Sequence, residues 1–391
     1  MAGKLFEEDA LLDAARRETG LSDFGPAHFR EGLGVLLQAL GTEAKLKPEA
    51  VPYQRFRILE QLTKRLHVQD WFTRHPEILR EKVERPICIL GSPRSGSSIM
   101  HELWSLDPAN RTPQAWEVYK PAPPPETATY HTDPRIAERQ AQFDAIYAMM
   151  PALRSMHRMG ATLPSEDVEI TSMDFASVVF FVDTYLPSYS RWLYDEVDYA
   201  PVFAGLRRYL QLLQWRAPGS PWVLKSLYTM HYMKAFLAEY PDARIIWLHR
   251  DPLAAMGSGA HLAVTMTMGQ ADGLDPVAVA RDIAHWSVVQ HDRMVDVQES
   301  GVLRPDQFVN VRFPDFVKDH VGTIARIYEH FGMTLRPEVA QKMRDYLAQH
   351  TADEHGKHKY SLGDLGLDAA EYRRKFGRYQ AYFGVGSDRT E

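Results

Sequence analysis

The fold is decided by the stretch Pro86-Ile-Cys-Ile-Leu-Gly-Ser-Pro-Arg-Ser-Gly-Ser-Ser-Ile-Met-His-Glu-Leu-Trp104. Its first five residues form a short continuous apolar run, which is typical of a strand buried in a parallel sheet. A glycine-bounded loop follows over residues 91–98, and residues 99–104 have helical character. A strand, a loop and a helix in this order indicate an α/β protein, because parallel strands need long crossover connections.

Three later segments repeat this pattern of a short apolar run followed by a helix. The runs cover residues 222–224, 244–248 and 308–311, and the helices that follow cover 228–240, a segment from Pro252, and 315–331. Helices are also predicted over 135–160, over 199–215 and from Asp368 onward. We therefore expect an α/β fold with a P-loop-type parallel sheet flanked by helices on both faces.

The first 85 residues differ from the rest because they contain few strand signals. Apolar residues recur at helical spacing, as in Leu33, Leu36 and Leu37. The sequence predicts two parts, an N-terminal helical region over residues 1–85 and an α/β domain over residues 86–391.

The composition bounds the class of protein. The 391 residues include 45 Lys and Arg, 51 Asp and Glu, and one cysteine, which gives a net charge of -6. The negative charge argues against nucleic acid as a partner, and a lone cysteine fits a reducing compartment. The charged start lacks the apolar core of a secretory signal, and the longest apolar run, residues 175–182, is too short to span a membrane. We expect a cytoplasmic protein, with homo-oligomerisation left open.

The loop itself has the spacing of a phosphate-binding loop, with Gly91 and Gly96 separated by four residues. Glycines let backbone N–H groups wrap an anion, and the next helix points its positive end at the same place. A nucleotide triphosphatase would have Lys at position 97, where this chain has Ser97. A nucleotide-dependent phosphotransferase is therefore the weaker alternative, and a catalytically silent nucleotide-binding protein is a third reading.

Two motifs carry a family resemblance. Pro93-Arg-Ser-Gly-Ser-Ser98 resembles the 5′-phosphosulfate-binding loop of sulfotransferases, usually PRSGTT or PKSGTT, and Arg250 followed by Ser258 resembles the 3′-phosphate motif of that family. The resemblance covers most of residues 86–380 and implies the donor 3′-phosphoadenosine 5′-phosphosulfate (PAPS), with no metal required. It assigns donor binding to the whole loop: Gly91, Ser92, Pro93, Arg94, Ser95, Gly96, Ser97 and Ser98.

Other segments complete the implied donor site. Phe313 stands where the family usually has a tyrosine, so its ring is expected near the adenine. Lys357 and Lys359 belong to a basic C-terminal segment that resembles the loop closing over the 3′-phosphate in related enzymes. By the same resemblance Arg94 and Lys225 stabilise charge on the group that is transferred.

The sequence offers two sets of candidates for the general base. Glu117 is the first choice, because some sulfotransferases have a glutamate base at a comparable distance after the loop. The second set is His157, Glu166 and Asp167. Such a base must take a proton from the acceptor hydroxyl.

The acceptor is the least specified partner. Methionines and aromatic residues gather between the two motifs and can line an apolar pocket. We expect an apolar or aromatic alcohol, and we expect residues 261–275 to form a mobile loop beside it, because Gly269, Asp272 and Gly273 favour turns.

Overall fold

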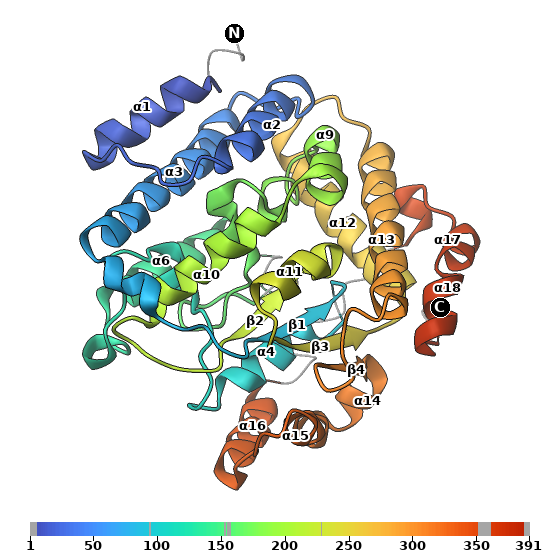
Figure 1. The fold of residues 1–391 in the computed structure, drawn as a ribbon. Helices are drawn as coiled ribbons and strands as arrows, with labels where there is room; N and C mark the ends of the chain where they lie inside the picture. The colour runs from blue at the N-terminus through green and yellow to red at the C-terminus, as the bar shows by residue number, and fades with distance from the viewer. Residues whose placement is uncertain are drawn as a thin grey trace.

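The computed structural model describes residues 6–93, 95–151, 154, 158–227, 229–350 and 361–386. Its centre is a sheet of four parallel strands, β1 (Ile87–Gly91), β2 (Val223–Ser226), β3 (Arg244–His249) and β4 (Phe308–Arg312), in the order β2-β1-β3-β4. All four strands predicted from the apolar runs are present. The α/β fold with a parallel sheet is confirmed (Figure 1).

Alternate residues of each strand face opposite layers of helices, as a pleated strand requires. Ile87 and Ile89 belong to an apolar cluster with α4 (Ser97–Ser105), α15 (His320–His330) and α16 (Pro337–Gln349). Cys88 and Leu90 face a larger cluster that includes α10 (Ala200–Gln214), α11 (Met233–Glu239) and α13 (Pro276–Glu299). Both faces of β1, β2 and β3 are therefore buried, which explains their continuous apolar runs, whereas the edge strand β4 is partly exposed.

The N-terminal region is helical, as its spacing predicts. It comprises α1 (Glu8–Thr19), α2 (Phe29–Thr42), α3 (Val51–Arg74) and the 3-10 turn η2 (Pro76–Arg80). Leu33, Leu36 and Leu62 are buried in the same apolar cluster as Leu90 of β1. These helices thus form a further layer over one face of the sheet. The division of the chain into two parts at residue 85 stays a prediction.

The segment before β2 consists mainly of short elements that a periodic pattern could not reveal. Apart from α6 (Pro134–Met149), they are α5 (Ala115–Tyr119), η3 (Thr127–Thr129), α8 (Val168–Thr171), η4 (Ser172–Asp174), η5 (Val178–Phe180), α9 (Pro187–Arg191) and the π-helical turn η6 (Trp192–Glu196). The 3-10 turn η7 (Thr229–Tyr232) lies between β2 and α11.

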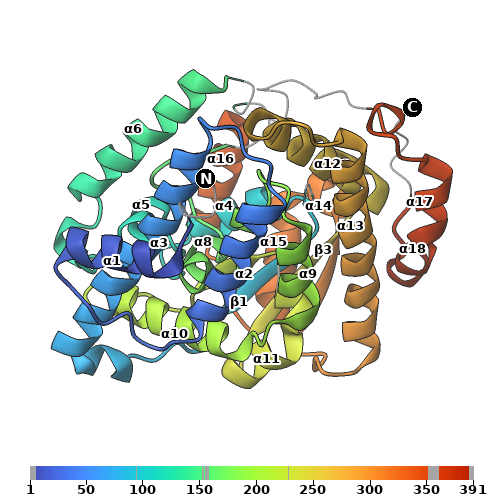
Figure 2. The ribbon, with the colours of Figure 1, turned by 90° about the horizontal axis from the view of Figure 1, so that it is seen from above.

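The last two helices lie on the side of the molecule opposite α1 (Figure 2). The long helix α12 (Pro252–Gln270) contacts α13 and α17 (Ala369–Lys375), and α18 (Gly377–Phe383) packs on α13. The turn η8 (Gly363–Leu365) precedes α17, and α14 (Phe313–Lys318) follows β4 directly.

Two predictions about this half of the chain are wrong. Residues 261–270 form the second half of α12 instead of a loop, because the residues that favour turns come only at its end. The helix predicted over 315–331 is two helices, because the Asp319 side chain accepts from the Gly322 N–H and starts α15 afresh. Within the described residues, no helix is both long and apolar enough to cross a bilayer.

Candidate functional site

The loop after β1 approaches the rest of the backbone too closely for side chains at its glycines. A Cβ on Gly91 would lie 2.4 Å from Ser95 Oγ and 3.1 Å from Leu248 O. Gly96 has a φ of 90°, which favours glycine, and a Cβ there would lie 3.1 Å from the Phe313 ring. Both glycines therefore stand where any side chain would collide with neighbouring residues.

The same loop opens directly into α4, so that the first-turn N–H groups of this helix face the turn. Ser95 is fully buried, and its Oγ has no hydrogen-bond partner among the described residues. Ser97 is buried and Ser98 is exposed at the start of the helix, while Pro93 is exposed within the loop. Helix N–H groups and an unpartnered hydroxyl around a cradle that a Cβ would fill are suited to a phosphate or phosphosulfate group.

Arg250 lies at the same edge of the sheet as this loop. It follows β3, and β3 pairs with β1 so that Leu248 stands beside Gly91. The Arg250 guanidinium carbon lies 4.2 Å from the centre of the Phe313 ring, and a Cβ on Gly96 would lie 3.1 Å from an edge atom of the same ring. Ser258 lies half-buried on α12, two turns into the helix that begins after Arg250. Phe313 thus brings the two motifs together.

Lys225 of β2 reaches the loop from the other neighbouring strand. Its Nζ lies 2.9 Å from Ser98 Oγ and 2.6 Å from Glu166 Oε1. The lysine side chain is 7% exposed and that of Glu166 is 20% exposed, so the ion pair is partly open to solvent. A cation and a carboxylate therefore stand together at the start of α4.

Asp167 lies behind this pair and is held to β2 by a backbone bond from its N–H to Lys225 O. Burial raises the pKa of Asp167 to about 8, against the opposing effect of a hydrogen bond from Ser226. The carboxyl is consequently protonated at neutral pH and does not compete with Glu166 for the lysine charge.

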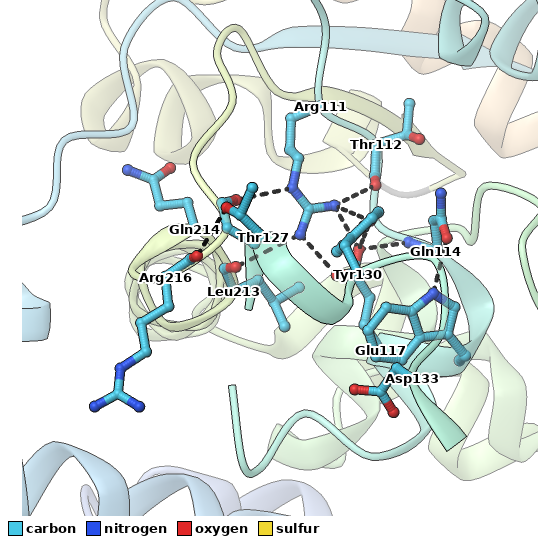
Figure 3. Close-up of polar contacts among 12 residues, drawn as sticks. Arg111, Thr112, Gln114, Glu117, Thr127, Tyr130, Asp133, Leu213, Gln214 and Arg216 are labelled. Atoms are coloured by element: carbon cyan, nitrogen blue, oxygen red, sulfur yellow. Dashed lines mark hydrogen bonds and ion pairs between the residues drawn. The ribbon is translucent and has the colours of Figure 1, made fainter. Parts of the chain in front are cut away.

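Glu117 has quite different surroundings (Figure 3). Its carboxylate oxygens each lie 2.7 Å from one terminal nitrogen of Arg111, and Oε1 also accepts from the Gln114 N–H. Tyr130 accepts from Arg111 and donates to Glu117 at 3.3 Å. With no exposed surface, Glu117 is fully engaged in a bidentate buried pair.

This pair is attached to the opposite edge of the sheet. Arg111 donates its N–H to Pro221 O and accepts from the Val223 N–H, at the first residue of β2. Val223 pairs with Ile87 at the beginning of β1, whereas the loop follows the end of β1. The assignment of Glu117 as the base stays a prediction. Because both of its oxygens are engaged and it lies at the other edge of the sheet, Glu166 is the better candidate for the base.

Four predicted site residues lie outside the described residues, namely Arg94, His157, Lys357 and Lys359. Among the described residues, no group of three His, Cys, Asp or Glu side chains is placed to hold a metal ion. Sequence reasoning missed His291, whose Nε2 lies 3.2 Å from Ser92 Oγ. Nothing in the local sequence of α13 indicates this contact, since it joins residues 199 positions apart.

Comparison with known proteins gives these features a context. The sequence profile of the sulfotransferase family matches residues 86–337. The chain is 25% identical over 282 residues to the omega-hydroxy-beta-dihydromenaquinone-9 sulfotransferase Stf3 of Mycobacterium tuberculosis, covering 68% of this chain and 67% of Stf3.

Two crystal structures resemble it over nearly their full length. Sulfotransferase STF9 from Mycobacterium avium has a TM-score of 0.87 and 30% identity, covering 97% of each chain. Sulfotransferase STF1 from Mycobacterium tuberculosis has a TM-score of 0.84 and 30% identity, covering 95% of this chain and 98% of its own. The profile match and these similarities show that the chain belongs to the sulfotransferase family.

Proposed function

We propose that this sulfotransferase uses PAPS as its donor and transfers the sulfuryl group to a hydroxyl of a small apolar or aromatic acceptor. The observation that carries the proposal is the convergence on Phe313. Gly96 of the loop approaches one part of its ring, and the Arg250 guanidinium lies over it at 4.2 Å. A donor with phosphate groups at both ends of an adenosine needs two anion sites joined by an apolar surface.

Within this proposal each motif has one task. The loop from Gly91 to Ser98 and the start of α4 hold the 5′-phosphosulfate, because the first-turn N–H groups of α4 face the loop. Arg250 and Ser258 hold the 3′-phosphate, for which a guanidinium offers a two-pronged donor. Phe313 provides a face for the adenine.

When bound, the donor supplies a sulfuryl group on a phosphate leaving group. The acceptor oxygen forms the new bond to sulfur as the bond from sulfur to the phosphate oxygen breaks, and the acceptor proton goes to a carboxylate. We assign that carboxylate to Glu166, because it lies 2.6 Å from Lys225, which in turn reaches Ser98 of the loop. Lys225 then stabilises the negative charge that develops on the transferred group and the leaving phosphate.

The acceptor is proposed from its chemistry. Stf3 is named for an omega-hydroxylated menaquinone, which pairs a hydroxyl with an apolar body. In this chain Met149 is 75% exposed and Met150 41% exposed at the end of α6, the region in which the methionines and aromatic residues gather. Such side chains favour an apolar acceptor over a sugar.

The donor is tested by thermal unfolding with 3′,5′-adenosine bisphosphate, the product expected from PAPS. A ligand at 100 times its Kd adds about 2.7 kcal/mol to the free energy of unfolding. We expect this bisphosphate to raise the Tm and ATP with Mg²⁺ to leave it unchanged. The reverse result would favour the phosphotransferase alternative.

The acceptor is tested by mass spectrometry of products from a panel of long-chain alcohols, phenols and sugars incubated with enzyme and PAPS. We expect an apolar alcohol or phenol to gain the mass of one sulfuryl group, SO3. A panel on which only sugars react would overturn the acceptor class, and a panel without any product would favour the catalytically silent reading.

A further inference from the structure

A chain of hydrogen bonds lies directly behind Arg250. His249, the last residue of β3, is fully buried, with Nδ1 2.9 Å from Tyr379 Oη and Nε2 2.9 Å from Asn310 Oδ1. Because an amide oxygen only accepts, Nε2 carries the ring proton. Burial lowers the pKa of His249 to about 4, so the ring is neutral and Nδ1 accepts from the tyrosine hydroxyl.

Tyr379 reaches this position from α18, far along the chain, and has no exposed surface. Burial raises the pKa of its phenol far above neutrality, against the smaller opposing effect of a hydrogen bond from the Arg250 backbone. The neutral hydroxyl therefore accepts from the Arg250 N–H and donates to His249. These two bonds fix the backbone at the residue whose guanidinium lies over Phe313.

The Tyr379 ring also supports the loop side of the site. It packs edge-on against His291, with ring centres 4.6 Å apart. His291 donates from Nδ1 to Ser287 O at 2.6 Å, which leaves Nε2 to accept from the Ser92 hydroxyl. One side chain of α18 thus stands between the histidine before Arg250 and the histidine that holds Ser92.

We propose that Tyr379 is a positioning residue for the donor, whose hydroxyl fixes Arg250 for the 3′-phosphate. This inference rests on the proposed function, because it takes Arg250 as the ligand of that phosphate. Tyr379 itself does not touch the donor. Its effect arises because a backbone fixed at Arg250 before binding leaves the guanidinium less conformational freedom to lose when the phosphate arrives.

The test compares two ligands in Tyr379→Phe, which keeps the ring and removes only the hydroxyl. We expect 3′,5′-adenosine bisphosphate to bind roughly five- to tenfold more weakly, the effect of one lost hydrogen bond. We expect 5′-AMP, which lacks the 3′-phosphate, to bind within about twofold of the wild type on the same grounds. Isothermal titration calorimetry gives both Kd values. Tyr382→Phe, on the same helix but 44% exposed, is the matched control and should change neither.

Arg250→Gln separates failure of this inference from failure of the proposed function. If Arg250→Gln does not weaken bisphosphate binding, the proposed function is wrong at the 3′-phosphate. If Arg250→Gln weakens it and Tyr379→Phe does not, only the inference is overturned. We expect the double variant to bind as weakly as Arg250→Gln alone, because the hydroxyl acts through the guanidinium.

Asn310→Ala provides a second test that leaves the core intact, because Asn310 lies at the exposed end of the chain of hydrogen bonds. It releases His249 Nε2 and should weaken bisphosphate binding about twofold without affecting 5′-AMP, a fraction of one hydrogen bond. An equal loss for both ligands in either variant would mean a general structural role and would overturn the proposal.

Discussion

Two carboxylate–cation pairs in this protein have the same chemistry and opposite surroundings. Glu117 and Arg111 lie at the starting edge of the sheet, where the carboxylate has no exposed surface and both oxygens accept from the guanidinium. Glu166 and Lys225 lie at the loop, where the carboxylate is 20% exposed and its Oε1 lies 2.6 Å from Lys225 Nζ. The comparison teaches that a fully buried pair is fixed as part of the fold, whereas a pair whose carboxylate is partly exposed can take up a proton.

The largest expected effect is on kcat, through the pair of Glu166 and Lys225. Glu166→Gln keeps the shape of the side chain and removes the basic oxygen, so we expect kcat to fall by about 10²–10⁴-fold, as for other general bases. Because the Lys225 side chain is only 7% exposed, losing its charged partner should also lower the Tm, so kcat is compared per folded molecule. Steady-state kinetics with a reactive acceptor measures the effect. If the variant keeps full kcat, Glu166 is not the base.

Changes to the buried pair of Glu117 and Arg111 should lower the free energy of unfolding instead of kcat. Glu117→Gln leaves the Arg111 charge buried without its partner, which typically costs about 3–5 kcal/mol of unfolding free energy. Urea unfolding measures this loss, and kcat per folded molecule should stay within a few-fold of the wild type. Replacing both partners, Arg111→Met with Glu117→Leu, is the matched control and should recover much of the stability. A large loss of kcat with unchanged stability would restore Glu117 as the base.

The third prediction concerns the buried His101 of α4, whose Nε2 lies 3.0 Å from Val223 O. Burial lowers its pKa to about 4, while an unfolded histidine titrates near 6.5. Between these values the unfolded state binds the extra proton, so stability is lost as pH falls from about 6.5 to about 4, by about 1.4 kcal/mol per pH unit.

The variant His101→Asn should remove this contribution and flatten the pH dependence of urea unfolding in that window. His67→Asn, at an exposed position on α3, is the control and should leave the slope as in the wild type. If the slope in His101→Asn equals that of the wild type, the ring is not held neutral in the folded state.

The smallest expected effect on kcat is at Asp167, beside the pair of Glu166 and Lys225. Since burial raises its pKa to about 8, the folded state keeps a proton that the unfolded state releases near pH 4. Stability from this group is therefore lost as pH rises from about 4 to about 8. Asp167→Asn mimics the protonated acid, so kcat at pH 6.5 should be unchanged and the decline toward pH 8 should be reduced. A loss of kcat at pH 6.5 would indicate that the ionised carboxylate takes part in the reaction.

Much of the fold could be predicted because its signals are local. The four strands are short apolar runs, and the loop after β1 carries its glycine spacing on a few consecutive residues. The helix over residues 261–270 could not be predicted, because Gly269 favours a turn locally. In the structure the packing of α12 against α13 continues the helix. Local preference is overruled when a long helix face is buried.

The sequence by itself determined the order of strands and helices, the tight turn between Gly91 and Gly96, and the presence of Arg250 at a strand end. These features depend on neighbouring residues and on the backbone freedom of glycine. Only the tertiary structure decided which carboxylate meets the loop and that Tyr379 stands behind Arg250. Such contacts join residues that are distant in the chain, and they exist because parallel strands bring the ends of separate segments to one edge.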